Sequence, residues 1–324
     1  MIKLAIGAVV PGAAATAVLL PAWWRHRLAS SDRAAGSAPT SIESHGEPFW
    51  VMPALASGIA AVMLPILSEA TAFPPATAEE WLPLAAVSLG LLELATRFKQ
   101  VPSWLRWGLR AVLLALLATA CARNFIKGSW STGTSAAWIG GFVAVTLAGT
   151  AVLERVLERQ RGLGAPLLLM TIVGGASQIL AVGYSSLKLG QAVGVMAAIL
   201  GAACLIALLR PRFSLAFGGS FVFVAFTATA TFAGDIAIEQ ERKALYTALI
   251  VLSMLLPGLS LIGPIARIGG WKRVFLLLAL AGTPVGIGLG IAGLHELNRE
   301  KDEYDYSLIA PIGAVPTLAS RLAP

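Results

Sequence analysis

The sequence predicts an all-α membrane protein: a polytopic bundle of about ten transmembrane helices. Two observations indicate this fold. First, 57% of the residues are hydrophobic and only 13% are charged, whereas soluble domains carry about 25% charged residues. So few charges cannot cover the surface of a water-soluble chain of this length. Second, the hydrophobic residues form runs of about 20, the length that a helix needs to cross a bilayer.

The hydrophobic runs divide the chain into its predicted helices. Most of the positive charge beside the first run, 4–24, follows the run rather than preceding it, and the run has no small-residue cleavage site. These two features predict a retained helix and not a signal peptide. Residues 28–48 are rich in Ala, Ser, Gly and Pro and predict a flexible cytoplasmic loop. The later runs are 49–68, 81–98, 102–122, 134–153, 164–183, 189–209, 213–234, 244–266 and 273–293.

Basic residues predict the orientation of the chain. Short loops rich in Lys and Arg stay on the cytoplasmic side of a membrane. Alternate loops of this chain hold most of its 24 basic residues, so both termini are predicted to be external. The basic set consists of Arg25, Arg27, Arg33, Arg97, Lys99, Arg106, Arg110, Arg155, Arg159, Arg161, Arg210, Arg212, Arg267, Lys272 and Arg273.

The chain is predicted to have two parts. Residues 1–293 form the transmembrane bundle, and residues 294–324 form an external C-terminal tail, of which 295–306 is densely charged and extends the last helix into water. Ala-, Gly- and Leu-rich helices and only two cysteines favour a bacterial inner membrane. The basic residues lie at the ends of hydrophobic runs rather than in a stripe or tail, which excludes nucleic acid as a partner.

Ionisable side chains inside a membrane are costly and are therefore candidate functional residues. Glu93 lies near the cytoplasmic end of its helix, and Arg97 is four residues further along the same helix. Arg110 lies about 12 Å into the next helix at 1.5 Å per residue. If these helices form a hairpin, Glu93 pairs with Arg97 or Arg110, either as a coupling or gating pair or as a structural salt bridge.

A second group of polar residues lies toward the external face. Thr227, Thr231 and Asp235 follow one another at intervals of four residues, so they share one helix face. Gln178 and Gln191 flank the turn between two other helices. Either these five residues line a polar cavity, or their side chains form the hydrogen bonds that commonly join membrane helices.

Small residues recur at intervals of four on two helices, which permits close helix packing. Besides membrane lipids, the predicted partners are therefore other membrane subunits or a second copy of the chain, bound through these Gly-rich faces. The residues concerned are Gly190, Gly194, Ala198 and Ala202 on one helix, and Gly282, Gly286 and Gly290 on the other.

The sequence predicts no catalytic residue, metal ligand or cofactor. The three histidines, His26, His45 and His295, lie in predicted loops or at a helix end, and no HExxH or GxSxG motif occurs. An enzyme is thus disfavoured but left open. The favoured function is permease-like passage of a small neutral or amphiphilic solute, or a lipid, without intramembrane proton coupling. The alternative is a structural or assembly subunit of a larger membrane complex.

Overall fold

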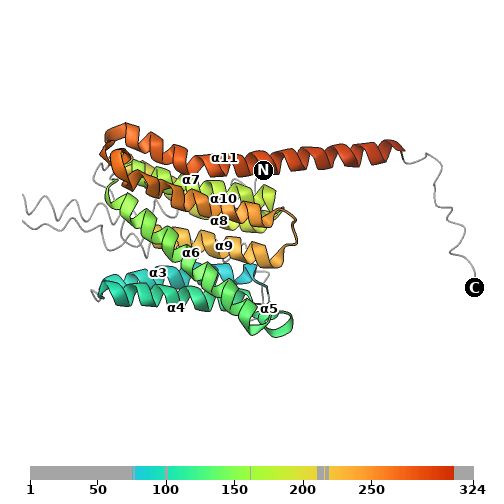
Figure 1. Cartoon of the computed structure of the whole chain (residues 1–324), viewed down its shortest axis with the longest axis horizontal. Helices are drawn as coiled ribbons and strands as arrows, with labels where there is room; N and C mark the ends of the chain where they lie inside the picture. Colours follow the sequence, from blue (N-terminus) through green and yellow to red (C-terminus); the bar gives the residue numbers. More distant parts are fainter. Residues whose placement is uncertain are drawn as a thin grey trace, which may run out of the picture.

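The structure, a computed structural model, describes residues 75, 77–98, 101–160, 162–209, 215 and 219–309. Helices and turns make up this part of the chain (Figure 1). The α-helices are α3 Leu82–Phe98, α4 Ser103–Cys121, α5 Arg123–Gly128, α6 Thr132–Glu158, α7 Gly164–Gln178, α8 Leu187–Leu209, α9 Gly219–Ala237, α10 Lys243–Leu255 and α11 Gly270–Ile309. Shorter helical segments are the 3₁₀-helices η1 Glu79–Trp81, η3 Leu256–Leu261 and η4 Gly263–Arg267, and the π-helix η2 Ile179–Gly183.

Seven helices in the described residues are long and apolar enough to cross a membrane. They are α4, α6, α7 with η2, α8, α9, α10 with η3, and the first 28 residues of α11. The chain is therefore a multi-pass integral membrane protein. The helices predicted from 81–98 onward are confirmed as helices, and α3, which has 17 residues, is slightly shorter than these seven. The predicted runs 4–24 and 49–68 and the predicted loop 28–48 lie outside the described residues.

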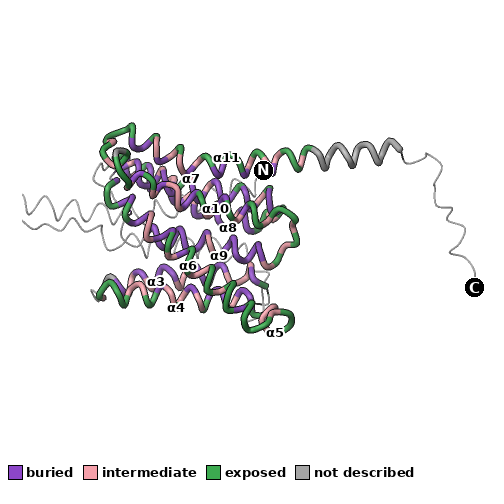
Figure 2. The backbone as a smooth tube through the Cα atoms, in the orientation of Figure 1, coloured by how far each residue is buried: buried purple, intermediate pink, exposed green. Residues whose placement is uncertain are grey.

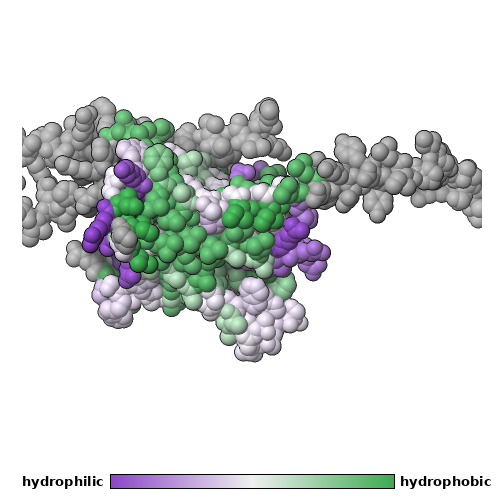
Figure 3. Space-filling view, turned by 45° about the horizontal axis from the view of Figure 1, so that its top comes forward, coloured by the Kyte–Doolittle hydropathy of each residue, from purple (hydrophilic) through white to green (hydrophobic). Residues whose placement is uncertain are grey.

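Successive long helices run in opposite directions, so the connections fall at two ends of the bundle (Figure 1). The α6–α7 and α10–α11 connections lie at the left end in Figure 1. These two connections carry basic residues, among them Arg159 and Arg267. Figure 3 shows a hydrophobic band between hydrophilic groups at both ends of the bundle. This pattern fits a protein that contacts lipid around its middle and water at its ends.

Helix α9 lies at the centre of the bundle. It contacts α3, α4, α6, α7, α8 and α10, and 83% of its membrane-spanning window is buried, against 22% for α6. Figure 2 shows α9 almost entirely in the colour of buried residues. Its threonine hydroxyls are satisfied locally: Thr227 donates to Phe223 O and Thr231 donates to Thr227 O. The helix can therefore carry hydroxyl groups through the core without partners on other helices.

Helices α7 and α8 form a closely packed hairpin. Ser177 Oγ donates to Gly190 O at 2.7 Å, and a Cβ atom at Gly194 would lie 3.1 Å from Ser177 Oγ. A Cβ at Gly190 would lie 2.9 Å from Ala181 Cα. Gly190 and Gly194 of α8 are therefore used inside the bundle, because only glycine permits this approach of the two backbones.

Two of the predicted helices end differently in the structure. Helix α6 continues to Glu158 rather than ending at 153, because charged residues in a last turn can reach the membrane surface without ending a helix. The run 244–266 is interrupted: α10 gives way to η3 and η4, which carry Pro257 and Pro264 near their starts, and proline cannot donate the hydrogen bond of a regular helix. The last helix, in contrast, extends beyond its hydrophobic run to Ile309, as predicted.

The contact at Gly190 yields a prediction about stability. Substituting Gly190→Ala should lower the free energy of unfolding by about 1–3 kcal/mol, because the added methyl group meets backbone atoms of η2 that cannot rotate away. Gly201→Ala is the matched control on the same helix, since a methyl group at Gly201 would meet no atom within 4 Å. Thermal unfolding in detergent should show a lower midpoint for Gly190→Ala alone, and equal midpoints would contradict the proposed packing.

Candidate functional site

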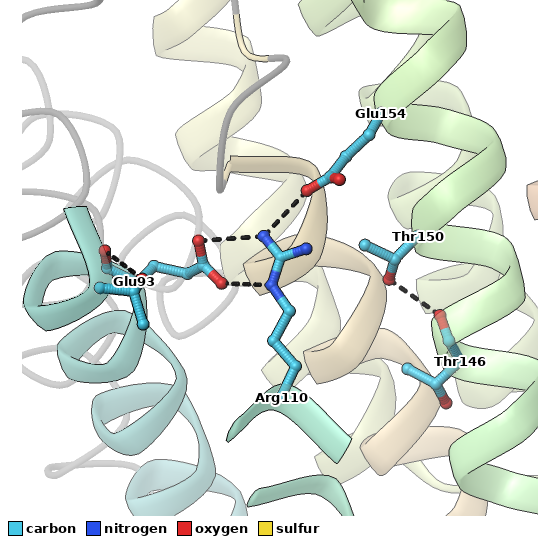
Figure 4. Close-up of polar contacts among 6 residues, drawn as sticks. Glu93, Arg110, Thr146, Thr150 and Glu154 are labelled. Carbon is cyan, nitrogen blue, oxygen red and sulfur yellow. Dashed lines mark hydrogen bonds and ion pairs between the residues drawn. The ribbon is translucent and has the colours of Figure 1, made fainter. Parts of the chain in front are cut away.

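Three helices meet at the side chain of Arg110. Arg110 Nε donates to Glu93 Oε1 at 2.6 Å, and Arg110 Nη2 donates to Glu93 Oε2 at 3.1 Å. Arg110 Nη2 also lies 2.8 Å from Glu154 Oε1, an ion contact without the alignment of a hydrogen bond. Figure 4 shows the guanidinium between the two carboxylates, with Glu93 on α3, Arg110 on α4 and Glu154 on α6.

This cluster is shielded from its surroundings. The exposed fractions are 0% for Arg110, 3% for Glu93 and 8% for Glu154. Aromatic rings cover the guanidinium: its Cζ lies 4.8 Å from the centroid of Trp107 and 4.5 Å from that of Phe221. A buried guanidinium is tolerated only when its charge is paired, and the ring faces add cation–π attraction.

The contacts of Arg110 join three helices. Its guanidinium pairs with Glu93 on α3 and lies in ion contact with Glu154 on α6. Arg106, one turn earlier on α4, has a buried Nε atom without a hydrogen-bond partner. The cluster of Glu93, Arg110 and Glu154 therefore joins the α3–α4 hairpin to α6.

Of the predicted ion-pair residues, the structure brings Glu93 and Arg110 together. The side chain of Arg97 lies outside those that the structure describes. Glu154 is missing from the residues predicted from the sequence, because the hydrophobic run ends at residue 153. A signal was present: Thr146, Thr150 and Glu154 recur at intervals of four residues, which places them on one face of α6.

A second polar cluster lies near the opposite end of the bundle. Tyr184 Oη donates to Asp235 Oδ1 at 2.6 Å. Thr247 Oγ1 lies 2.8 Å from both carboxylate oxygens of Asp235. Lys243 Nζ donates to the backbone oxygen of Asp235 at 2.8 Å, which satisfies a carbonyl in the last turn of α9. Asp235 therefore joins α9 to the turn after η2 and to the start of α10.

Tyr184 acts as a hydrogen-bond donor in this cluster. Its side chain is buried, and burial, followed by the charge of the neighbouring Asp235, raises the pKa of the phenol. The phenol therefore stays protonated and keeps its proton directed at the carboxylate.

A half-open pocket of about 360 Å³ lies beside this cluster, between α6, α9 and α10. Its walls are mostly apolar and aromatic, and its polar groups are Thr146, Thr231, Asp235 and Thr247. The complete lining is Ala137, Trp138, Gly141, Phe142, Val145, Thr146, Ala228, Thr231, Phe232, Asp235, Thr247, Ile250, Val251 and Met254. The pocket has the mixture of apolar walls and few polar groups that is typical of small-molecule sites.

The structure places two of the five predicted cavity residues, Thr231 and Asp235, at this pocket. Thr227 is buried and bonds to its own helix. Gln178 is exposed and Gln191 is partly exposed, and neither lines the pocket. The physical reason is the arrangement of the helices, because α6 and α10 form the other walls of the pocket rather than α7 and α8.

Comparison with models of known protein families gives no match, and comparison with curated protein sequences gives none either. Within the described residues, no group of three or more His, Cys, Asp or Glu side chains is placed to hold a metal ion. The two clusters and the pocket are therefore the features on which a functional proposal rests.

The Arg110 network yields a second prediction. Replacing Arg110 by Gln leaves two buried carboxylates without their main partner and should destabilise the protein by about 3–5 kcal/mol. Glu93→Gln should cost more than Glu154→Gln, because Glu93 receives two hydrogen bonds from Arg110 and Glu154 none. Unfolding of each purified variant in detergent would measure these differences.

The double variant Glu93→Gln/Arg110→Gln is the internal control. The sum of the stability losses in the two single variants should exceed the stability loss in the double variant, because both single variants report the same interaction. Strict additivity, or equal losses for the two glutamates, would contradict the assigned geometry.

Proposed function

We propose that this protein is permease-like: it binds a small neutral or amphiphilic solute, or a lipid, between α6, α9 and α10, and passes it without intramembrane proton coupling. The observation that carries the proposal is the pocket of about 360 Å³ with apolar walls and a polar end. Its volume falls within the range of about 300–1,000 Å³ that is usual for small-molecule sites.

The exposure of the lining residues indicates how a solute reaches the pocket. Trp138 and Val145 line the pocket and are 44% and 41% exposed. Both lie in the membrane-spanning part of α6, so this opening faces lipid. From Ala137 to Thr146 the pocket extends about 14 Å along α6 at 1.5 Å per residue, roughly half of the hydrocarbon core. A molecule with an apolar chain can therefore enter sideways from one leaflet.

The polar end of the pocket favours a particular headgroup. Asp235 presents carboxylate oxygens there, and Thr247 presents a hydroxyl oxygen. These atoms accept hydrogen bonds, so a ligand whose headgroup carries an O–H or N–H donor matches them. The apolar walls accommodate the remainder of the ligand.

The positions of the acidic groups support passage without proton coupling. Asp235 lies one turn beyond Phe232, whose ring contacts Trp138 of α6, whereas Glu154 lies 16 residues further along α6. That separation is about 24 Å. The α6 hydroxyls in this interval, Thr146 and Thr150, donate to carbonyl oxygens of their own helix. A proton relay needs titratable groups spaced through the membrane, so this wide separation of Asp235 and Glu154 supports passage without proton coupling.

The proposal includes the finer topology: about ten spans, both termini external, and residence in a bacterial inner membrane. The α6–α7 connection, which carries Arg159, and the α10–α11 connection, which carries Arg267, lie at one end of the bundle (Figure 1). Basic loops stay cytoplasmic, so the pocket lies in the external half of the membrane. The tail 294–324 then begins at that external side.

One observation favours the alternative, a subunit of a larger membrane complex or of a homo-oligomer. Methyl groups added at Gly286 and Gly290 of α11 would meet no atom within 4 Å. Gly286 and Gly290 are exposed, in contrast to Gly190 and Gly194 of α8, which contact residues inside the bundle. An open small-residue face allows another helix to approach closely.

A pocket-filling variant tests the favoured function. Gly141→Leu should block the pocket, because Gly141 lines it and has open space at its Cβ position. The protein would be reconstituted into liposomes with phosphatidylethanolamine that carries a fluorescent label on an acyl chain. Transfer between leaflets, measured by chemical quenching of the outer leaflet, should be faster with wild-type protein than in protein-free liposomes and should be abolished in Gly141→Leu.

Gly140→Leu is the matched control: Gly140 also has open space at its Cβ position but does not line the pocket. Its transfer rate should equal that of the wild type, and an imposed pH gradient should change neither rate. Absence of transfer by the wild type would refute permease-like passage of this lipid class. Transfer abolished by Glu93→Gln and driven by a pH gradient would refute the absence of proton coupling.

Labelling of single cysteines tests the proposed orientation. The native Cys121 and Cys204 are free and buried and would first be replaced by alanine. A cysteine at Ser129, which precedes the start of α6, should react with a membrane-impermeant maleimide in intact cells. A cysteine at Glu158, in the last turn of α6, should react only after permeabilisation. The reverse pattern would invert the topology.

A further inference from the structure

The start of α11 concentrates positive charge without a balancing acid. Its first turn contains Lys272 and Arg273 and no acidic residue. A helix N-terminus itself carries a partial positive charge and exposes backbone N–H groups, so it favours anions over cations. Two cations at this position are unfavourable unless an anion binds beside them.

Arg273 is the central residue of this region. It is only 9% exposed, and its Nε and Nη2 atoms are buried without a hydrogen-bond partner. Besides its burial, Arg273 experiences the charge of Arg159, which has the same sign. Among the described residues, no ion pair joins Arg273 to an acid, and the nearby Glu158 of α6 is exposed. Unpaired buried guanidinium donors carry a large desolvation cost.

The connection between α6 and α7 places Arg159 beside the start of α11. A Cβ at Gly164 would lie 3.0 Å from Val274 Cγ2 and closer still to Gln160 Nε2. Gln160 and Val274 are the neighbours in sequence of Arg159 and Arg273. Two guanidinium groups from different helices therefore lie at one end of the bundle, where the exposed Arg159 leaves an approach from water or from lipid headgroups.

We propose that this region binds a phosphate group, held by Arg273, Arg159 and the first N–H groups of α11. Arginine suits phosphate because its planar donors match two phosphate oxygens at once. The exposed Trp271 and Phe275 flank Arg273 on α11, and aromatic side chains at this level contact the interfacial region of a bilayer. The phosphate of an anionic phospholipid therefore fits the site, and a soluble phosphate has the same chemistry. This inference is independent of the pocket and of the proposed passage.

Thermal unfolding in detergent tests the site with three additives: dioleoylphosphatidylglycerol, dioleoylphosphatidylcholine and inorganic phosphate. Phosphatidylglycerol should raise the unfolding midpoint of the wild type, because a ligand that binds only the folded state stabilises it. The concentration needed for half of this increase should rise at least about tenfold in Arg273→Gln, since charge-assisted hydrogen bonds are lost. Arg159→Gln, at an exposed position, should raise this half-maximal concentration by a smaller factor.

Arg123→Gln is the matched control, because Arg123 is an exposed arginine at the opposite end of the bundle and should respond to lipid as the wild type does. If inorganic phosphate alone raises the unfolding midpoint, and this effect is lost in Arg273→Gln, the result would support the site and assign it to a soluble phosphate. Equal increases from both lipids that all variants retain would overturn the proposal.

The stability of Arg273→Gln without any additive separates a binding role from a structural one. If Arg273 binds an external phosphate, the additive-free variant should be at least as stable as the wild type, because an unpaired buried charge has been removed. A large loss of stability without additive would instead identify Arg273 as part of an internal network and would overturn the proposal.

Discussion

The pairing of Arg110 with Glu93 and Glu154 is the interaction on which the arrangement of α3, α4 and α6 depends. Helix α4 buries only one stripe of residues: Arg110, Leu114, Leu117, Ala118 and Cys121. Its other faces are open to lipid, so apolar packing alone gives α4 little preference for one neighbour over another. A charge inside the membrane supplies that preference, because it is tolerated only where both acids reach it. The hydrogen-bonding fork of the guanidinium thus selects one depth and one rotation of α4.

The positions of the helices could be predicted from the sequence because crossing a bilayer requires a hydrophobic run of nearly fixed length. The proximity of Glu93 and Arg110 could also be anticipated, since a hairpin places residues at equal distances from its turn at equal depths. Glu154 was missed, because a hydrophobic run ends at its first charged residue while the helix continues for another turn; only its spacing from Thr146 and Thr150 pointed to it. The pocket could not be predicted either: Gln178 and Asp235 lie at similar distances from helix ends, and only the lateral order of the helices separates them.

Helix α9 connects the two polar clusters. Phe221, near its start, covers the Arg110 guanidinium, and Asp235, near its end, forms the polar end of the pocket. Contacts with six other helices surround it, so its displacement would disturb both clusters and most of the core at once. A pocket wall that moves during loading must therefore be another helix.

That wall is α6. Most of its length faces lipid, and it contributes Trp138, Gly141 and Val145 to the opening of the pocket. At its other end, Glu154 is held against Arg110. Helix α6 also contacts α9 and α10, which form the other walls of the pocket, so a tilt about the fixed end would separate α6 from these two helices. The ion network and the pocket then have complementary roles in the proposed passage: the former holds the end of α6 nearest the basic loops, and the latter lies along the part of α6 that carries the exposed Trp138 and Val145.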